Sequence, residues 1–238
     1  MDLVSLQIKT TDDFDTNLDK LLTLIKDQSI NSFILAPELC LNGYSYDRLD
    51  DAVAITNKAI KELKILSSDK TIALTMTTKQ DNNYLNTLFV FHKGEIVHTQ
   101  SKNKLFVLND ERLHFTSGDE NDINIFQVGD LKVASIICFE LRFIDFWKKL
   151  QGADLILIPS MWGKLRKQNF ETLSKAIAVM NQCFVIATNS ANDDMAKSSG
   201  IISPFGDEYR DDLKEVLKKE LHLNEIKKMR RYMQVGIN

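Results

Sequence analysis

Short runs of apolar residues constrain the fold of this chain more than any other feature. Two of them, Phe33 to Ala36 and Leu155 to Ile158, end at a proline, and a third, Val133 to Ile137, ends at Cys138. Each run has the length of a strand and lacks the alternation of apolar and polar residues that a strand with one wet face shows. The runs therefore predict strands that are buried on both faces, as in layered α/β proteins.

Between these strands, apolar residues recur at the three- and four-residue spacing of a helix. Lys93-Gly94 separates two strand-like segments and is typical of a two-residue hairpin turn. Helical crossovers join parallel strands and hairpins join antiparallel ones, so the combination implies mixed sheets. The helical spacing is found in these segments: Leu18 to Ile25, Ile55 to Leu66, Phe143 to Leu150 and Phe170 to Met180.

The chain shows no change of composition that would mark a linker. It has 238 residues with only 9 Gly and 3 Pro, so we expect a single domain over residues 1–238. After Gly206 the sequence becomes charged, and Leu213, Leu217 and Leu221 follow at helical spacing. We therefore expect a charged, helical C-terminal tail from about residue 207.

The charge balance and the cysteine count exclude several classes of protein. There are 30 Lys+Arg against 33 Asp+Glu, a net charge of −3, whereas a general nucleic-acid-binding protein carries a basic surface. No segment has the roughly 18 to 20 consecutive apolar residues of a membrane span, and the first residues lack the regions of a signal peptide. Three cysteines are an odd number and do not suggest a disulfide framework. We expect a cytoplasmic protein with no nucleic-acid or membrane partner.

Reactive side chains stand where predicted strands end: Glu38, Lys102, Lys104 and Cys138. Taken singly, each has an ordinary explanation as a solvated or a core residue. Together they form a complete set for acyl transfer. A thiol needs a base to attack at neutral pH, a buried carboxylate can be that base, and a lysine can stabilise the charge that develops on a carbonyl oxygen. A Cys–His pair has little support, because two of the 4 histidines lie in the predicted hairpin and one in the charged tail.

The residues around these side chains resemble the motifs of the nitrilase, or carbon–nitrogen hydrolase, superfamily. The likeness extends from Gln7 to about Gly206. It implies a four-layer αββα sandwich with mixed sheets and a Glu–Lys–Cys catalytic triad. It also implies no metal ion, no organic cofactor, and a homodimer or higher homo-oligomer. The strongest parts of the likeness follow the family's order along the chain: Phe33 to Tyr44, Lys102 to Phe106, Asp110 to Gly118 and Ile137 to Phe143.

The resemblance assigns the family's catalytic roles to particular residues. Glu38 would be the general base and Cys138 the nucleophile. The family's spacing of a lysine, two residues and a leucine selects Lys102 over Lys104. Glu111 matches a second glutamate, which in the family positions the substrate and orients the triad.

Within the family, the motifs resemble most closely the branch of the ω-amidases and the Nit-type proteins, which cleave the terminal amide of small α-keto acid amides. Arg142 suits the carboxylate of such a substrate, because a guanidinium group binds carboxylates bidentately. The alternative is a structural ion pair with Asp145. The family implies that the backbone N–H of the residue after the nucleophile helps to hold the oxyanion. We expect the substrate pocket to contain Tyr44, Phe139, Arg142, Met161 and Trp162.

The chain departs from the family pattern in a few places. In the cysteine motif Phe139, Glu140, Ile144 and Asp145 replace Tyr, Asp, Pro and Glu, and Met180 replaces a glutamate of a later motif. The tail is also shortened. The leading hypothesis is an amidase that acts on a small carboxamide. The alternatives are an N-carbamoyl amidohydrolase with the same triad, and a degenerate, non-catalytic member that acts as a binding or scaffold protein. A working site should contain one fast-reacting thiol of low pKa.

Overall fold

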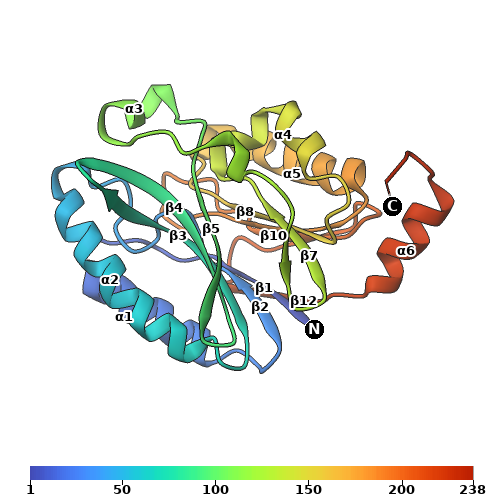
Figure 1. Cartoon of the computed structure of the whole chain (residues 1–238), viewed down its shortest axis with the longest axis horizontal. Helices are drawn as coiled ribbons and strands as arrows, with labels where there is room; N and C mark the ends of the chain where they lie inside the picture. The colour runs from blue at the N-terminus through green and yellow to red at the C-terminus, as the bar shows by residue number, and fades with distance from the viewer. Residues whose placement is uncertain (238) are drawn as a thin grey trace.

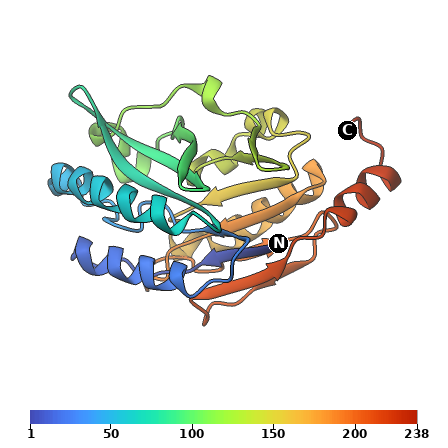
Figure 2. The ribbon, with the colours of Figure 1, turned by 60° about the horizontal axis from the view of Figure 1, so that its bottom comes forward.

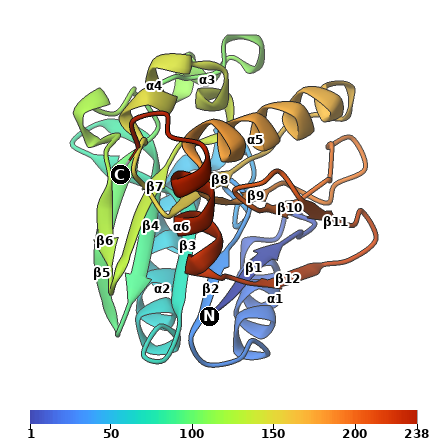
Figure 3. The same ribbon diagram turned by 90° about the vertical axis from the view of Figure 1, so that its right-hand side faces the viewer.

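The computed structural model describes residues 1–237 and shows two six-stranded β-sheets with helices on both outer faces (Figure 1). Figure 3 shows the layers from the side, with α5 (Lys167–Asn181) above the sheets and α1 (Phe14–Lys26) and α2 (Leu49–Leu66) below them. This α–β–β–α arrangement confirms the predicted fold. The shorter helices are α3 (Glu111–His114), α4 (Ile144–Lys149) and α6 (Leu223–Tyr232).

The first sheet joins strands from both ends of the chain. It consists of β12 (Val216–Glu220), β1 (Asp2–Leu6), β2 (Ser32–Leu35), β3 (Thr71–Gln80), β4 (Asn83–His92) and β5 (Glu95–Ser101), in that order. Strands β1 to β3 run parallel, and the other neighbours run antiparallel. Figure 2 shows the late strand β12 beside β1.

The second sheet is mixed in the same way. It consists of β11 (Glu208–Arg210), β10 (Gly200–Ile202), β9 (Phe184–Thr188), β8 (Leu155–Pro159), β7 (Leu131–Ser135) and β6 (Phe126–Val128), in that order. Strands β7 to β9 run parallel, and the other neighbours run antiparallel. The two mixed sheets agree with the prediction.

Alternate residues of the central strands pack against different layers, which explains the uninterrupted apolar runs. In β2, Phe33 and Leu35 belong to the core between the sheets, together with Val133 of β7. Ile34 belongs to the core between the first sheet and helices α1 and α2. A strand with a core on each face needs apolar side chains at successive positions.

Buried polar side chains also connect the two sheets. Thr188 Oγ1, in the second sheet, donates to the carbonyl oxygen of Ala36 at 3.2 Å. Gln100 Nε2, in the first sheet, donates to the carbonyl oxygen of Ser135 at 3.1 Å. Buried polar groups need such partners, so these bonds favour one position of each sheet against the other.

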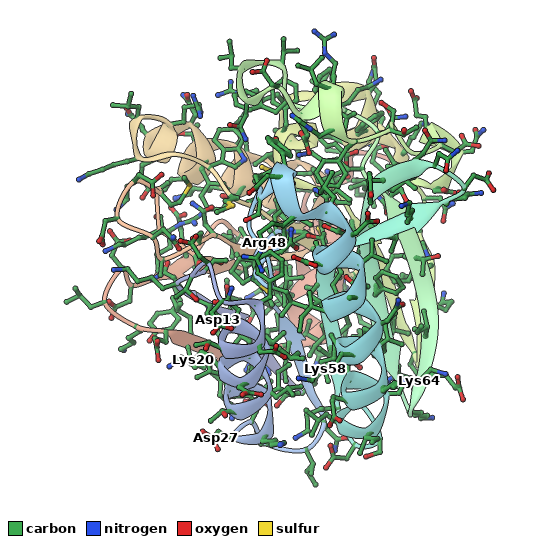
Figure 4. The ribbon with its side chains drawn as sticks, turned by 90° about the vertical axis from the view of Figure 1, so that its left-hand side faces the viewer. Asp13, Lys20, Asp27, Arg48, Lys58 and Lys64 are labelled. Carbon is green, nitrogen blue, oxygen red and sulfur yellow. The ribbon has the colours of Figure 1, made fainter. Side chains whose placement is uncertain are left out.

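Helices α1 and α2 cover the outer face of the first sheet side by side (Figure 4). Asp13 caps α1, since its side chain accepts a hydrogen bond from the Thr16 N–H at 3.0 Å. Lys58 of α2 forms an ion pair with Asp15 of α1. The helices thus bury an apolar face and present charged side chains to solvent.

The predicted hairpin at Lys93-Gly94 is confirmed and joins β4 to β5. A second hairpin, which the sequence analysis missed, joins β3 to β4 through Asp81-Asn82. Asp81 has a φ of +53°, and aspartate tolerates the left-handed conformation that tight hairpins need. The signal for this turn was therefore present in the sequence.

The prediction of a helical tail from about residue 207 is wrong in its first half. Residues 208–220 contain β11 and β12, and α6 begins only at Leu223. Strand β12 lies at the edge of its sheet, where charged side chains such as Lys218 are common and hinder pairing with other chains. Leu217 is buried, but Leu213 is 94% exposed, so the helical spacing of these leucines does not reflect one buried face.

Candidate active site

A buried cluster of three charged side chains lies where loops of the first sheet meet. Glu38 follows β2, Lys102 follows β5, and Glu111 begins α3. Lys102 Nζ lies 2.8 Å from Glu38 Oε1 and 2.9 Å from each carboxylate oxygen of Glu111. None of the three side chains is more than 1% exposed. One ammonium group therefore bonds with both carboxylates.

Lys104, the alternative lysine, lies outside this cluster. Its Nζ is 3.5 Å from Glu120 Oε2 and 5.2 Å from the centre of the Phe146 ring. The side chain is 33% exposed, whereas that of Lys102 is fully buried. The geometry favours Lys102, as the family spacing predicts.

The backbone and side chain of Glu38 are held by several contacts. The next residue, Leu39, has a φ of +46° and donates its N–H to Thr75 Oγ1 at 2.8 Å. Asn86 Nδ2 donates to Glu38 Oε1 at 2.9 Å. Glu38 Oε2 is buried and has no hydrogen-bond partner within residues 1–237. This oxygen is free to accept a proton.

Cys138 lies at a sharp turn beyond β7, which ends at Ser135, two residues before the end of the apolar run. It is the first residue of the 3-10 helix η4 (Cys138–Arg142), and its φ is +51°. Such a conformation costs a cysteine about 1–3 kcal/mol and is found most often at functional sites. The turn places Cys138 in the wall of a pocket, where it is 7% exposed.

The surroundings of Cys138 keep its thiol protonated. Burial raises the pKa of Cys138 well above its ordinary value, and the negative charge of Glu38 raises it further, while Lys102 and the Met161 N–H oppose them. The expectation of a low-pKa thiol is therefore wrong. The ammonium group of Lys102 opposes this rise only in part, because it also neutralises two carboxylates. The carboxylate of Glu38 is close enough to Cys138 to act on the protonation of its thiol.

The same charges determine the protonation of the neighbouring groups. Burial acts to lower the pKa of Lys102, but the carboxylates of Glu38 and Glu111 outweigh it, so the pKa is raised and the ammonium form persists. Burial raises the pKa of Glu111 despite the opposing charge of Lys102. Burial and the two carboxylates also raise the pKa of Tyr44, whose neutral hydroxyl lies 3.2 Å from Lys102 Nζ.

Two adjoining cavities, which share Cys138, Phe106 and Met161 in their walls, together form the pocket of this site. The cavity beside Tyr44 and Lys102 has a volume of about 340 Å³, and the narrow cavity beside Arg142 and Trp162 has about 30 Å³. A volume of this size suits a small molecule. The residues predicted for substrate binding all line the pocket: Tyr44, Phe139, Arg142, Met161 and Trp162.

Two arginines line the pocket, and each lies over an aromatic ring. Arg142 Cζ is 4.8 Å from the centre of the Trp162 ring, and Arg166 Cζ is 5.1 Å from that of Phe106. Arg142 also donates to Asn169 Oδ1 at 3.2 Å. Within the described part of the chain, neither guanidinium group forms an ion pair with a carboxylate. The pocket therefore contains positive charge that is available to a ligand.

Arg142 does not form the ion pair with Asp145 that was one of its two predicted roles. Asp145, its predicted partner in a structural ion pair, instead lies 3.3 Å from Lys148.

Two departures from the family pattern, Ile144 and Met180, are 64% and 61% exposed. These two side chains therefore do not disturb the buried cluster.

Sequence reasoning missed two residues of the site. Arg166 lies a few residues beyond Trp162, and its signal was a basic residue close to a predicted pocket residue. Asn86, which donates to Glu38, is a polar residue of β4 and is 1% exposed. A buried amide in a strand indicates a polar partner nearby.

Metal-ligating clusters and membrane-spanning helices are both absent from residues 1–237. This part of the chain has no group of three or more His, Cys, Asp or Glu side chains arranged to hold a metal ion. None of the helices in the same range combines the length and the apolar character needed to cross a membrane.

Comparison with known proteins places the chain in a family. The model of the carbon-nitrogen hydrolase family matches residues 3–231, and the chain belongs to this family. It is similar to the 2-oxoglutaramate amidase of Bacillus subtilis (strain 168), with 27% identity over 233 residues, 92% of this chain and 89% of the relative. It is also similar to the omega-amidase YafV of Escherichia coli (strain K12), with 24% identity over 73% of this chain and 70% of the relative. The predicted family and the predicted class of enzyme, an amidase-type hydrolase, are confirmed.

Solved structures show the same fold. The carbon-nitrogen hydrolase of Helicobacter pylori superimposes with a TM-score of 0.86 at 20% identity, over 98% of this chain and 93% of the other. Nit3 of Saccharomyces cerevisiae, a member of branch 10 of the nitrilase superfamily, has a TM-score of 0.85 at 19% identity, over 99% and 95%.

Proposed function

We propose that this chain is an ω-amidase-like hydrolase, which releases ammonia from a small carboxamide that also carries a carboxylate. The pair Arg142 and Arg166 beside Cys138 carries the proposal. Guanidinium groups bind carboxylates bidentately, so the arginines would hold one end of the substrate while its amide reaches the thiol. Relatives named 2-oxoglutaramate amidase and omega-amidase support this substrate class.

In the first half of the proposed reaction, Glu38 takes the thiol proton of Cys138 while Sγ attacks the amide carbonyl carbon. The Lys102 ammonium and the Phe139 N–H hold the oxyanion, and one such donor can lower the barrier by about 3–4 kcal/mol. When the C–N bond breaks, Glu38 gives its proton to the leaving nitrogen, which departs as ammonia. A thioester remains on Cys138.

In the second half, Glu38 removes a proton from water, and the hydroxide attacks the thioester carbonyl. The C–S bond breaks, the carboxylic acid leaves, and the thiolate regains its proton from Glu38. Glu111 accepts hydrogen bonds from Lys102 with both oxygens, and its proposed role is to hold the ammonium group in place.

The first test measures ammonia release by wild type and Cys138→Ala. The panel contains α-ketoglutaramate, α-ketosuccinamate, glutamine, N-carbamoyl-β-alanine, a simple nitrile and butyramide, which lacks a carboxylate. We expect release from an α-keto acid amide that is lost in Cys138→Ala. Release from N-carbamoyl-β-alanine alone would favour the N-carbamoyl amidohydrolase, and no release together with no alkylation of Cys138 would favour a non-catalytic protein.

The second test addresses the arginines. A hydrogen bond to a charged group contributes about 1.5–3 kcal/mol, so Arg142→Gln and Arg166→Gln should each raise KM for the carboxylated amide by about tenfold or more. Butyramide is the matched control, and its kcat/KM should change little. An equal loss for both substrates would contradict a carboxylate-binding role.

A homodimer and a cytoplasmic location stay predictions from the resemblance. Sedimentation equilibrium of the purified protein tests the first, and fractionation of the producing cell tests the second.

A further inference from the structure

The buried carboxylate of Glu140 has no step in the proposed reaction, yet it contacts both segments that carry the reacting groups. Glu140 lies in η4 and is 0% exposed. Its Oε2 accepts a hydrogen bond from the Ile137 N–H at 2.7 Å. Its Oε1 accepts from the Asn103 N–H at 2.6 Å and from the Lys104 N–H at 3.3 Å. Both oxygens are therefore occupied by backbone donors.

These donors flank the two groups that act on the substrate in the proposed mechanism. Ile137 directly precedes Cys138, and Asn103 directly follows Lys102. The two segments come from different sheets, since one follows β7 and the other follows β5. A single carboxylate thus links the nucleophile of the second sheet to the lysine of the first.

The position of this link matters because of the local backbone. The bond to the Ile137 N–H fixes the peptide just before Cys138, whose φ of +51° is unfavourable. Three backbone N–H groups that share one buried carboxylate can hold such a turn. Misplacement of reacting groups by about 1 Å can lower a rate about 10²-fold.

We propose that Glu140 is a positioning residue, which sets the separation between Cys138 and Lys102 by holding the backbone beside each of them. The inference rests on the proposed function for its link to catalysis, but the link between the two segments does not depend on any substrate. Glu140 touches neither reacting side chain with its carboxylate, so it acts through the backbone and is not itself a catalytic residue.

The test compares Glu140→Gln, Glu140→Asp and the control Asp145→Asn. Gln keeps the size but cannot accept at its amide nitrogen, so we expect kcat to fall about 10- to 100-fold with KM within about twofold. Asp keeps the charge and should lose less, about threefold to tenfold. Asp145 is an exposed carboxylate of α4 that pairs with Lys148, and its variant should match wild type.

A second measurement separates this inference from the proposed function. The rate of alkylation of Cys138 by iodoacetamide requires a placed thiol and its base but no amide substrate. We expect Glu140→Gln to slow it about tenfold, even if wild type cleaves no amide in the panel. An unchanged or faster rate of alkylation in Glu140→Gln would overturn the proposal. A lower thermal midpoint of this variant with wild-type kcat would also overturn it, because Glu140 would then only cap the helix η4. If Glu140→Gln does not fold, Glu140→Asp carries the test, and a wild-type kcat in that variant overturns the proposal.

Discussion

Replacement of Lys102 by methionine is the sharpest test of the buried cluster. The change removes the ammonium group and keeps a side chain of similar length. In the native protein Lys102 Nζ lies 2.8 Å from Glu38 and 2.9 Å from Glu111, and all three side chains are shielded from water. Loss of one partner from a buried ion pair costs about 3–5 kcal/mol, because the remaining charges stay buried without compensation. We expect Lys102→Met to lose that much free energy of unfolding at about pH 8.

The matched control is Lys104→Met, two residues away. Its Nζ lies 3.5 Å from Glu120, and the side chains are 33% and 46% exposed. Exposed ion pairs contribute about 0–1 kcal/mol, so this variant should unfold nearly as wild type does. The activities of the two variants should differ in the same direction. Lys102 is the proposed oxyanion donor and Lys104 is not, and loss of such a donor lowers kcat by about 10²–10³.

The assay is urea unfolding followed by fluorescence, at about pH 8 and about pH 5, with ammonia release measured beside it. Lys102 lowers the pKa of Glu111, so its removal raises that pKa further and lets the carboxylate take up a proton in mild acid. The deficit of Lys102→Met should therefore shrink as the pH falls. Equal losses of stability and activity in the two lysine variants would refute this account of the cluster.

Three further predictions follow from the geometry. A Cβ on Gly118 would lie 2.3 Å from the carbonyl oxygen of Ser101, so Gly118→Ala should lower both the unfolding midpoint in urea and the activity. A wild-type midpoint would contradict the close approach of these two segments. Burial raises the pKa of Glu140 from 4.5 to about 7, so the folded state binds the extra proton between these values. Protonation of Glu140 stabilises the folded state in acid, and this contribution is lost as the pH rises. Between about pH 4.5 and pH 8, wild type should therefore lose about 3 kcal/mol more free energy of unfolding than Glu140→Gln. Parallel changes of the two proteins in urea unfolding would argue against this. Iodoacetamide should label Cys138 alone in the native protein, since Cys40 and Cys183 are at most 2% exposed. Mass spectrometry of the peptides checks this, and labelling of Cys40 or Cys183 would contradict their burial.

A layered α/β architecture could be predicted from local patterns, whereas the order of its four layers came from the resemblance to the family. The run Phe33 to Ala36 required a core on each face, and Lys93-Gly94 required a hairpin. The tail could not be read in this way. Strand β12 pairs with β1 at the other end of the chain, and that partner overrides the helical spacing of its leucines.

The residues of the site could be predicted better than their electrostatics. Motif spacing selected Lys102, and the structure places that lysine in the cluster. The raised pKa of Cys138 was not foreseen, because it depends on burial and on Glu38, which is distant in sequence. Arg166 was missed because its importance comes from the pocket that surrounds it.

The division of the site between the two sheets has a consequence for folding. Glu38 and Lys102 belong to loops of the first sheet, while Cys138 belongs to a loop of the second. Until the sheets have docked, Cys138 is separated from Glu38 and Lys102, so a partly folded chain has no assembled site. In a refolding experiment, the return of enzyme activity therefore times the docking of the two sheets, separately from the formation of helices and strands.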